Sequence, residues 1–170
     1  MDFISHGLWG GIALGRGNRR QFGLAALFSI LPDIFSEGIM FTMVLLNLPG
    51  MPGLADGHPN ITDFPHYAQI FYNLWHSLVV FAVVFGLVWL IRKKPLWIML
   101  TWALHILIDI PTHSLELFPT PFLWPLADFK FDGIGWEHPA VLLTDIGLLF
   151  GVYLIWLYPK IVALTNKGRR

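Results

Sequence analysis

Four apolar segments, each close to the length that crosses a lipid bilayer, constrain the fold of this chain more than any other feature of its sequence. A membrane-spanning helix needs about 20 predominantly apolar residues. Lipid-exposed strands would leave unpaired edges in hydrocarbon, so helices are expected instead. The sequence predicts an all-α, integral membrane helical bundle of about four transmembrane helices, over Phe22 to Leu48, Leu74 to Ile91, Leu96 to Ile110 and Pro139 to Tyr158.

A shorter apolar stretch, Ile4 to Leu14, precedes these segments. It is too short to cross a bilayer alone, but Gly7, Gly11 and Gly15 recur every four residues, the spacing that lets two helices approach closely. We expect a short N-terminal helix packed against the bundle. With 55% hydrophobic and 13% charged residues and no internal repeat, residues 1–170 are expected to form a single membrane-embedded domain.

Basic residues predict the orientation in the membrane. Ten of the eleven fall in three short clusters, at positions 16–20, 92–94 and 160–170, whereas the two long loops hold six acidic residues and only Lys130. Alternating spans place the three clusters on one side, which the positive-inside rule makes cytoplasmic. The chain is therefore predicted to be a multi-pass protein of the bacterial inner membrane with a cytoplasmic C-terminus. Its net charge of zero predicts no nucleic-acid partner.

Ionisable residues inside the apolar segments are the candidate functional residues. His105, Asp109 and His113 follow one another at intervals of four, which places helical side chains on one face with Cβ atoms about 5–6 Å apart. The first two can bind one ion or two adjacent ions. Pro111 disturbs the last turn, so His113 is expected either on the helix or at the start of the outer loop, from where it can fold back.

Asp33, His76 and Asp145 reach the same depth as this group, between mid-membrane and the outer face. Pro32 should kink or break the helix that carries Asp33. Ionisable groups in a membrane persist where they pair, coordinate an ion or line a wet cavity. Structural hydrogen bonds between helices are the alternative, with Asp145 as a counter-charge. His6 is either a further ligand or an interfacial residue.

The absence of cysteine restricts any metal site to imidazole and carboxylate ligands, and a divalent metal, most simply zinc, is the predicted cofactor. A bound ion would activate water, and a further carboxylate, Asp145 or Glu116, would take the proton. The predicted metal ligands are His6, Asp33, His76, His105, Asp109 and His113.

Five short motifs carry a resemblance to a known family: Ser5-His6-Gly7, Leu31-Pro32-Asp33, Trp75-His76-Ser77, His105-Ile-Leu-Ile-Asp109 and Leu123-Trp124-Pro125-Leu126. In this order they resemble the bacterial membrane-bound, metal-dependent hydrolases, some of which are LexA-regulated. The resemblance spans most of the chain and implies metal-dependent hydrolysis. The family commonly shows Arg-x-x-His-Ser with a further upstream His. Here the stretch from Phe71 to Ser77 keeps the His-Ser pair but lacks the Arg and the upstream His.

A more distant similarity links His105, Asp109, Pro111 and His113 to the His-x-x-x-Asp…Pro-x-His segment of the zinc-dependent phospholipase C and S1/P1 nuclease superfamily. It implies an all-α fold with clustered zinc ions and phosphoester hydrolysis by His105 and Asp109. Asp33 would then be a catalytic, bridging carboxylate.

Three hypotheses for function follow from the sequence. The first is a membrane-bound metal-dependent hydrolase acting on an amphiphilic or small-molecule phosphoester, in the first instance a membrane lipid. The second is an ion- or proton-coupled transporter that uses the same residues, and the third is a non-catalytic membrane protein. The chain contains neither a Gly-x-Ser-x-Gly elbow nor a phosphate-binding glycine loop, which argues against serine and nucleotide chemistry.

Overall fold

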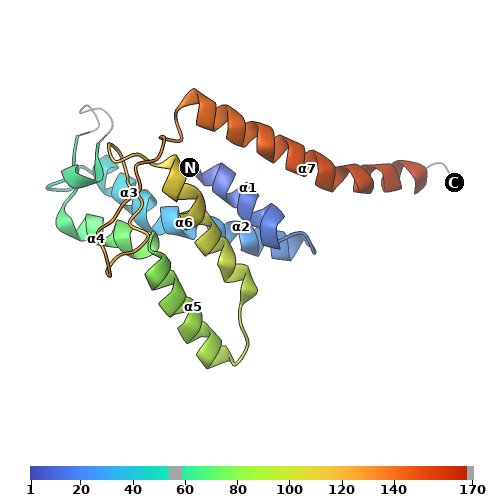
Figure 1. Cartoon of the computed structure of the whole chain (residues 1–170), viewed down its shortest axis with the longest axis horizontal. Coiled ribbons are helices and arrows are strands. Elements are labelled where there is room, and N and C mark those ends of the chain that lie inside the picture. Colours follow the sequence, from blue (N-terminus) through green and yellow to red (C-terminus); the bar gives the residue numbers. More distant parts are fainter. Residues whose placement is uncertain (54–58, 168–170) are drawn as a thin grey trace.

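The computed structural model describes residues 1–53 and 59–167, which are 68% helical and contain no strand. The side chains of Lys160 and of residues 162–167 lie outside the description, as do residues 168–170, and with them the third basic cluster. The all-α class is therefore confirmed. Figure 1 shows the helices α1 (Phe3–Leu14), α2 (Arg19–Asp33), α3 (Ile39–Leu45), α4 (His66–Trp75), α5 (Leu78–Arg92), α6 (Leu100–Thr112) and α7 (Pro139–Lys167).

Within the described residues, two helices are long and apolar enough to cross a membrane, and three if a bent pair counts as one span. The prediction of four spans is not supported. The two long helices are Arg19–Leu45, which joins α2 to α3, and Pro139–Pro159 of α7. The bent pair is α4 and α5, which meet at an angle of 59°.

The other two apolar segments form helices too short to cross a membrane alone. The Ser77 side chain accepts from the Val79 and Val80 amides and caps α5, while the Leu78 amide donates to the Phe122 carbonyl at 3.0 Å. The predicted second span, Leu74 to Ile91, therefore corresponds to α5, with its first two residues at the end of α4. The third is the helical stretch Trp97–Thr112, which at a rise of about 1.5 Å per residue covers about 24 Å, less than the bilayer core.

Pro32 does not break the first long helix. A π-helical turn, η1 (Ile34–Gly38), follows directly after α2, and the chain continues into α3. The Ser36 hydroxyl donates to the Pro32 carbonyl at 2.6 Å within this turn. The π-helical turn thus absorbs the irregularity and leaves Asp33 as the last residue of α2.

The short helix α1 packs against α2 through glycines, as the sequence predicted. A Cβ atom at Gly10 would lie 2.8 Å from the Ala25 carbonyl oxygen, and one at Gly11 would lie 2.5 Å from the Phe22 ring. A Cβ atom at Gly15 would lie 2.5 Å from the Phe22 Cα atom, whereas at Gly7 the nearest atom would be 3.4 Å away. The tight approach therefore includes Gly10, Gly11 and Gly15. This packing carries His6 of α1 into the interior.

Helix α7 stands apart from the other helices. It lies along α1 and extends beyond it (Figure 1), and most of its apolar side chains are exposed, with Ile155 at 75%. Tyr153 donates a hydrogen bond to the Leu8 carbonyl at 2.9 Å, and Trp156 stacks on Phe22. The interior of the protein is therefore built by α1 to α6.

Two small apolar cores flank the ionisable residues. The first joins α3 and α4 and includes Met40, Val44 and Tyr72; the second joins α5 and α6 and includes Phe81 and Ile106. The Tyr72 ring stacks on His76 with centroids 4.2 Å apart, and Ile106 follows His105 on α6. The ionisable residues thus lie between the two cores.

Candidate metal centre

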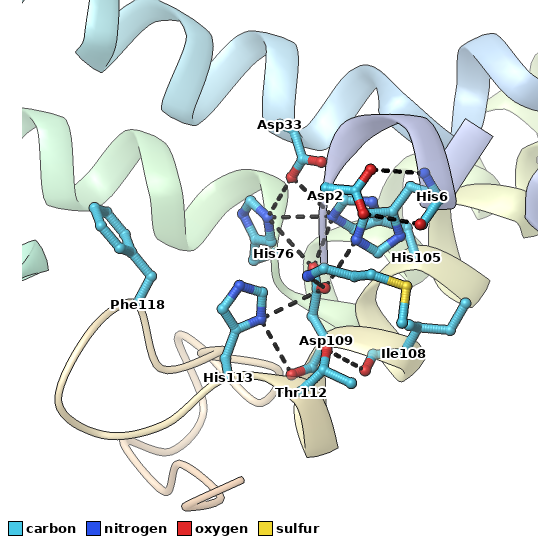
Figure 2. Close-up of polar contacts among 12 residues, drawn as sticks. Asp2, His6, Asp33, His76, His105, Ile108, Asp109, Thr112, His113 and Phe118 are labelled. Atoms are coloured by element: carbon cyan, nitrogen blue, oxygen red, sulfur yellow. Dashed lines mark hydrogen bonds and ion pairs between the residues drawn. The ribbon is translucent and has the colours of Figure 1, made fainter. Parts of the chain in front are cut away.

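Four buried side chains converge from separate parts of the chain: Asp33 at the end of α2, His76 at the end of α4, and His105 and Asp109 on α6. Each offers one ligand atom within 4.8 Å of the others. Figure 2 shows the four side chains pointing toward one another. These residues form a buried Asp/His/His/Asp group, called here the four-ligand group, that can hold a metal ion.

Five distances between ligand atoms of the four-ligand group, from 2.9 to 3.8 Å, lie near those of tetrahedral coordination. His105 Nε2 lies 3.2 Å from His76 Nε2, 3.2 Å from Asp33 Oδ1 and 2.9 Å from Asp109 Oδ2. His76 Nε2 lies 3.3 Å from Asp33 Oδ1 and 3.8 Å from Asp109 Oδ2. Ligand atoms of a tetrahedral zinc ion, with bonds of about 2.0–2.2 Å, lie about 3.3–3.6 Å apart.

The chemistry of the donor set also fits a cation. Two imidazole nitrogens and two carboxylates face one another, and they offer more lone pairs than the two rings can supply protons. Asp33 Oδ2 and Asp109 Oδ2 are buried without a hydrogen-bond partner in the described chain, although Asp109 Oδ2 lies close to His105 Nε2. A buried acceptor without a donor is unfavourable by about 1–3 kcal/mol. A metal ion in the four-ligand group would satisfy Asp109 Oδ2, and Asp33 Oδ2 as well if Asp33 binds through both oxygens.

The backbone around His76 holds its ring in the orientation that ligation needs. His76 Nδ1 lies 3.1 Å from the Tyr72 carbonyl, and a proton on Nδ1 leaves the Nε2 lone pair facing the four-ligand group. The bend between α4 and α5 is closed by carbonyls of a distant loop: the Leu78 amide donates to Phe122, and the Ser77 hydroxyl donates to Trp124. The His76-Ser77 and Trp124-Pro125 motifs therefore meet at this bend.

The second oxygen of Asp109 faces a different set of nitrogens. Asp109 Oδ1 lies 2.7 Å from the Met1 nitrogen, 2.9 Å from His6 Nε2 and 3.4 Å from His113 Nδ1. His6 also stacks on His105, with ring centroids 3.7 Å apart. Asp109 thus bridges the four-ligand group and this second group of nitrogens.

The structure resolves the two alternatives left open for His6 and His113. His6 is fully buried beside Asp109 rather than interfacial. His113 is the first residue beyond α6, in extended conformation, and its ring turns back so that Nδ1 lies 3.2 Å from the Asp109 carbonyl. All six predicted ligands therefore come together, four in one group and two beside Asp109.

Two predicted proton acceptors lie elsewhere. The Asp145 carboxylate on α7 accepts hydrogen bonds from the Ser5 hydroxyl at 2.6 Å and the Trp9 indole at 2.7 Å, which tie α7 to α1. Glu116 lies exposed in the loop after α6, where its backbone carbonyl accepts from the Asn60 side chain at 2.5 Å. Neither belongs to the four-ligand group, and their catalytic role stays a prediction without a supporting contact.

Glu37 is a carboxylate that the sequence reasoning missed. It lies in the π-helical turn, four residues after Asp33, is partly buried and lines a cavity together with His113. Its spacing from Asp33 within an apolar segment is the same signal that identified His105 and Asp109. The nitrogen of Met1 was missed as well, and no pattern in the sequence would have placed it at Asp109.

Comparisons with family models, curated proteins and solved structures find no match for this chain.

Proposed function

We propose that this protein is a membrane-bound, metal-dependent hydrolase of phosphoesters, with zinc in the four-ligand group. The observation that carries the proposal is the near-tetrahedral convergence of Asp33, His76, His105 and Asp109. Ionisable groups are kept in apolar helices where they bind an ion or line a functional cavity. A set of four such groups from distant segments favours ion binding over packing.

Zinc is favoured by the donor set. Imidazole and carboxylate ligands in a tetrahedral arrangement suit zinc, whereas calcium and magnesium prefer six or more oxygen ligands, water included. Two of the four ligands here are imidazoles, and the chain contains no cysteine. The proposed ion is therefore a zinc ion with nitrogen and oxygen ligands.

A second ion would occupy the other side of Asp109. Its nearest ligand atoms would be Asp109 Oδ1 and His6 Nε2, which lie 2.9 Å apart, and the ion would replace the Met1 ammonium group at Asp109 Oδ1. His113 would join them only after its Nδ1 releases the Asp109 carbonyl. Ions in such sites supply Lewis acidity to the phosphoryl group and lower the pKa of a water molecule. A carboxylate shared between two sites is suited to phosphoester hydrolysis, because both the attacking and the leaving oxygen then have a cation nearby.

Glu37 is the carboxylate best placed to exchange a proton with the reacting groups. It is not among the four ligands, yet it lines the cavity that reaches His113. A proton acceptor must lie within reach of the attacking water without being held by the metal. Glu37 meets this requirement better than Asp145, which already accepts hydrogen bonds from Ser5 and Trp9.

Metal analysis combined with an activity assay tests the proposed function. Purified full-length protein should contain zinc, hydrolyse a nitrophenyl phosphodiester, lose activity with a chelator and regain it with added zinc. His105→Ala should lose both metal and activity, whereas Leu107→Ala, at an exposed position on the same helix, should keep both. Wild-type protein without metal, or full metal content in His105→Ala, would contradict the proposal.

A transporter is the second candidate, favoured by two interruptions of helices. The π-helical turn after Asp33 and the 59° bend beside His76 both adjoin four-ligand residues, and broken helices frequently form ion sites in transporters. The sequence has no internal repeat, which argues against this candidate. Zinc flux into proteoliposomes without phosphoester hydrolysis would favour transport over hydrolysis.

A further inference from the structure

A cavity of about 440 Å³ opens beside the candidate metal centre, within the range of known ligand sites. It lies between α3, the segment from Pro59 to Phe64 and the loops that follow α6. Its wall is mainly apolar and is formed by Met40, Phe41, Val44, Phe64, Phe118 and Trp136. The size and the lining suit an apolar ligand.

The cavity reaches the candidate metal centre at His113, and none of the four-ligand residues is among its described lining. His113 lines the cavity, and its Nδ1 lies 3.4 Å from Asp109 Oδ1. Figure 2 shows Phe118 beyond His113 and His76, on the side away from His6. Phe118 is fixed there by its carbonyl, which accepts a hydrogen bond from Tyr72 at 2.8 Å. A molecule with its phosphate near Asp109 could therefore extend into the cavity past His113.

The charges in the cavity restrict what it can hold. Its charged side chains are the acids Glu37 and Glu137, and none of the described lining residues is Lys or Arg. Phosphates in protein sites are typically held by Arg or Lys. The part of the substrate that lies in the cavity therefore carries no second phosphate, which disfavours nucleotides with several phosphates.

The mouth of the cavity adjoins an apolar outer surface. Phe41 lines the cavity and is 55% exposed, and Leu45 and Leu46 continue the exposed apolar surface of α3. Such a surface on a helix of a membrane protein is expected to face lipid. An apolar chain can thus enter from the bilayer without crossing water.

We propose that this cavity binds the apolar chain of a single-phosphate amphiphile while its phosphate lies at the metal centre. The inference rests on the proposed hydrolase function and names its substrate class: phosphoesters of long-chain apolar alcohols. It predicts that the depth of the cavity limits the length of chain that the enzyme accepts.

Chain-length dependence of hydrolysis tests this inference. Nitrophenyl phosphodiesters with ethyl, hexyl or decyl chains are compared in the same detergent. For each ester, the concentration of free substrate is then the same for wild type and variants. For wild type, kcat/KM should rise with chain length, by at most about fourfold per methylene. Val44→Phe should lower kcat/KM for the decyl ester by about tenfold or more, as overpacking does, and leave the ethyl ester nearly unchanged.

Two further variants make the result interpretable. Leu117→Trp narrows the same cavity from a partly buried loop position and should act like Val44→Phe even if that variant folds poorly. Leu90→Phe, on an exposed part of α5, is the matched control and should change nothing. The inference would be overturned if both cavity variants lost kcat/KM equally for all chain lengths. It would also be overturned if wild type cleaved a nitrophenyl ester of thymidine monophosphate as well as the decyl ester.

A photolabel separates this inference from the proposed function. Decylphosphonate with a diazirine at the chain end should label α3 and the segment around Phe118, and Leu117→Trp should abolish this labelling. Labelling spread over the exposed faces of α5 and α7, and unaffected by the variant, would overturn the inference. The labelling needs no turnover, so cavity labelling in a protein that binds no metal and cleaves no ester would contradict the proposed function and leave the apolar-chain site in place.

Discussion

Helices α6 and α7 are both apolar, and each buries one aspartate, but the two aspartates have different surroundings. Asp109 on α6 lies among the imidazoles of His6, His105 and His113. Asp145 on α7 accepts hydrogen bonds from two neutral donors, Ser5 and Trp9. Burial of a carboxylate in an apolar helix therefore does not identify a functional site; the chemistry of its neighbours does.

The neighbours differ because the helices pack differently. α6 lies inside the protein, where α1, the end of α2 and the α4–α5 bend contribute His6, Asp33 and His76. α7 contacts α1 with one side and exposes the other. Of these two helices, the interior α6 contributes two members of the four-ligand group, and α7 contributes none.

Asp109→Asn should have the largest effect on metal binding. Asp109 faces both the four-ligand group and the second group of nitrogens, so the loss of its charge should remove every bound ion and abolish activity. The measurement is metal per protein by elemental analysis. Asp145→Asn is the matched control in the other helix, and an equal metal loss in both variants would break the comparison.

His105→Ala should weaken metal binding by more than about 100-fold, because even partners outside the coordination shell contribute 10–100-fold. His105 Nε2 lies within 3.2 Å of the other three ligand atoms. Competition with a chromogenic chelator measures the affinity. Leu107→Ala, at an exposed position two residues away, should retain wild-type affinity; unchanged affinity in His105→Ala would remove this residue from the site.

His6→Ala should remove one ion and leave the other. His6 contacts Asp109 Oδ1 but is not one of the four ligands, so the metal content should fall from two ions to one. Elemental analysis alongside circular dichroism separates this outcome from unfolding. A wild-type protein that binds a single ion, with the same content in His6→Ala, would show that His6 has only a packing role against His105.

Asp145→Asn should have the smallest effect on metal and act on stability instead. The Asn side chain has only one oxygen, so its amide can accept one of the two hydrogen bonds, and its NH2 group then faces the other donor. The unfolding free energy should fall by about 1–3 kcal/mol. Thermal unfolding in detergent measures the change, with Leu148→Ala on exposed α7 as control. Unchanged stability together with metal loss would give Asp145 the role that the sequence predicted.

The number of spans and the identity of the proton acceptor could not be predicted from the sequence, because both depend on tertiary contacts. Hydropathy identified the long apolar segments but not α4, most of which precedes the predicted second span. The bend between α4 and α5 depends on a contact from elsewhere, the Phe122 carbonyl that accepts from the Leu78 amide. Asp145 and Glu37 look alike as acids in apolar segments. Their difference arises from Ser5 and Trp9, residues more than 100 positions away in the chain.

The sequence by itself determined the all-α class and the His105–Asp109 pair, because helix formation and four-residue spacing are local properties of an apolar chain. It also identified the other candidate ligands by their unusual place in apolar surroundings. The tertiary structure alone decided that Asp33, His6 and His76 meet this pair, that Asp109 bridges two groups, and that a cavity opens beside them. These features depend on the packing of distant segments, which no local pattern encodes.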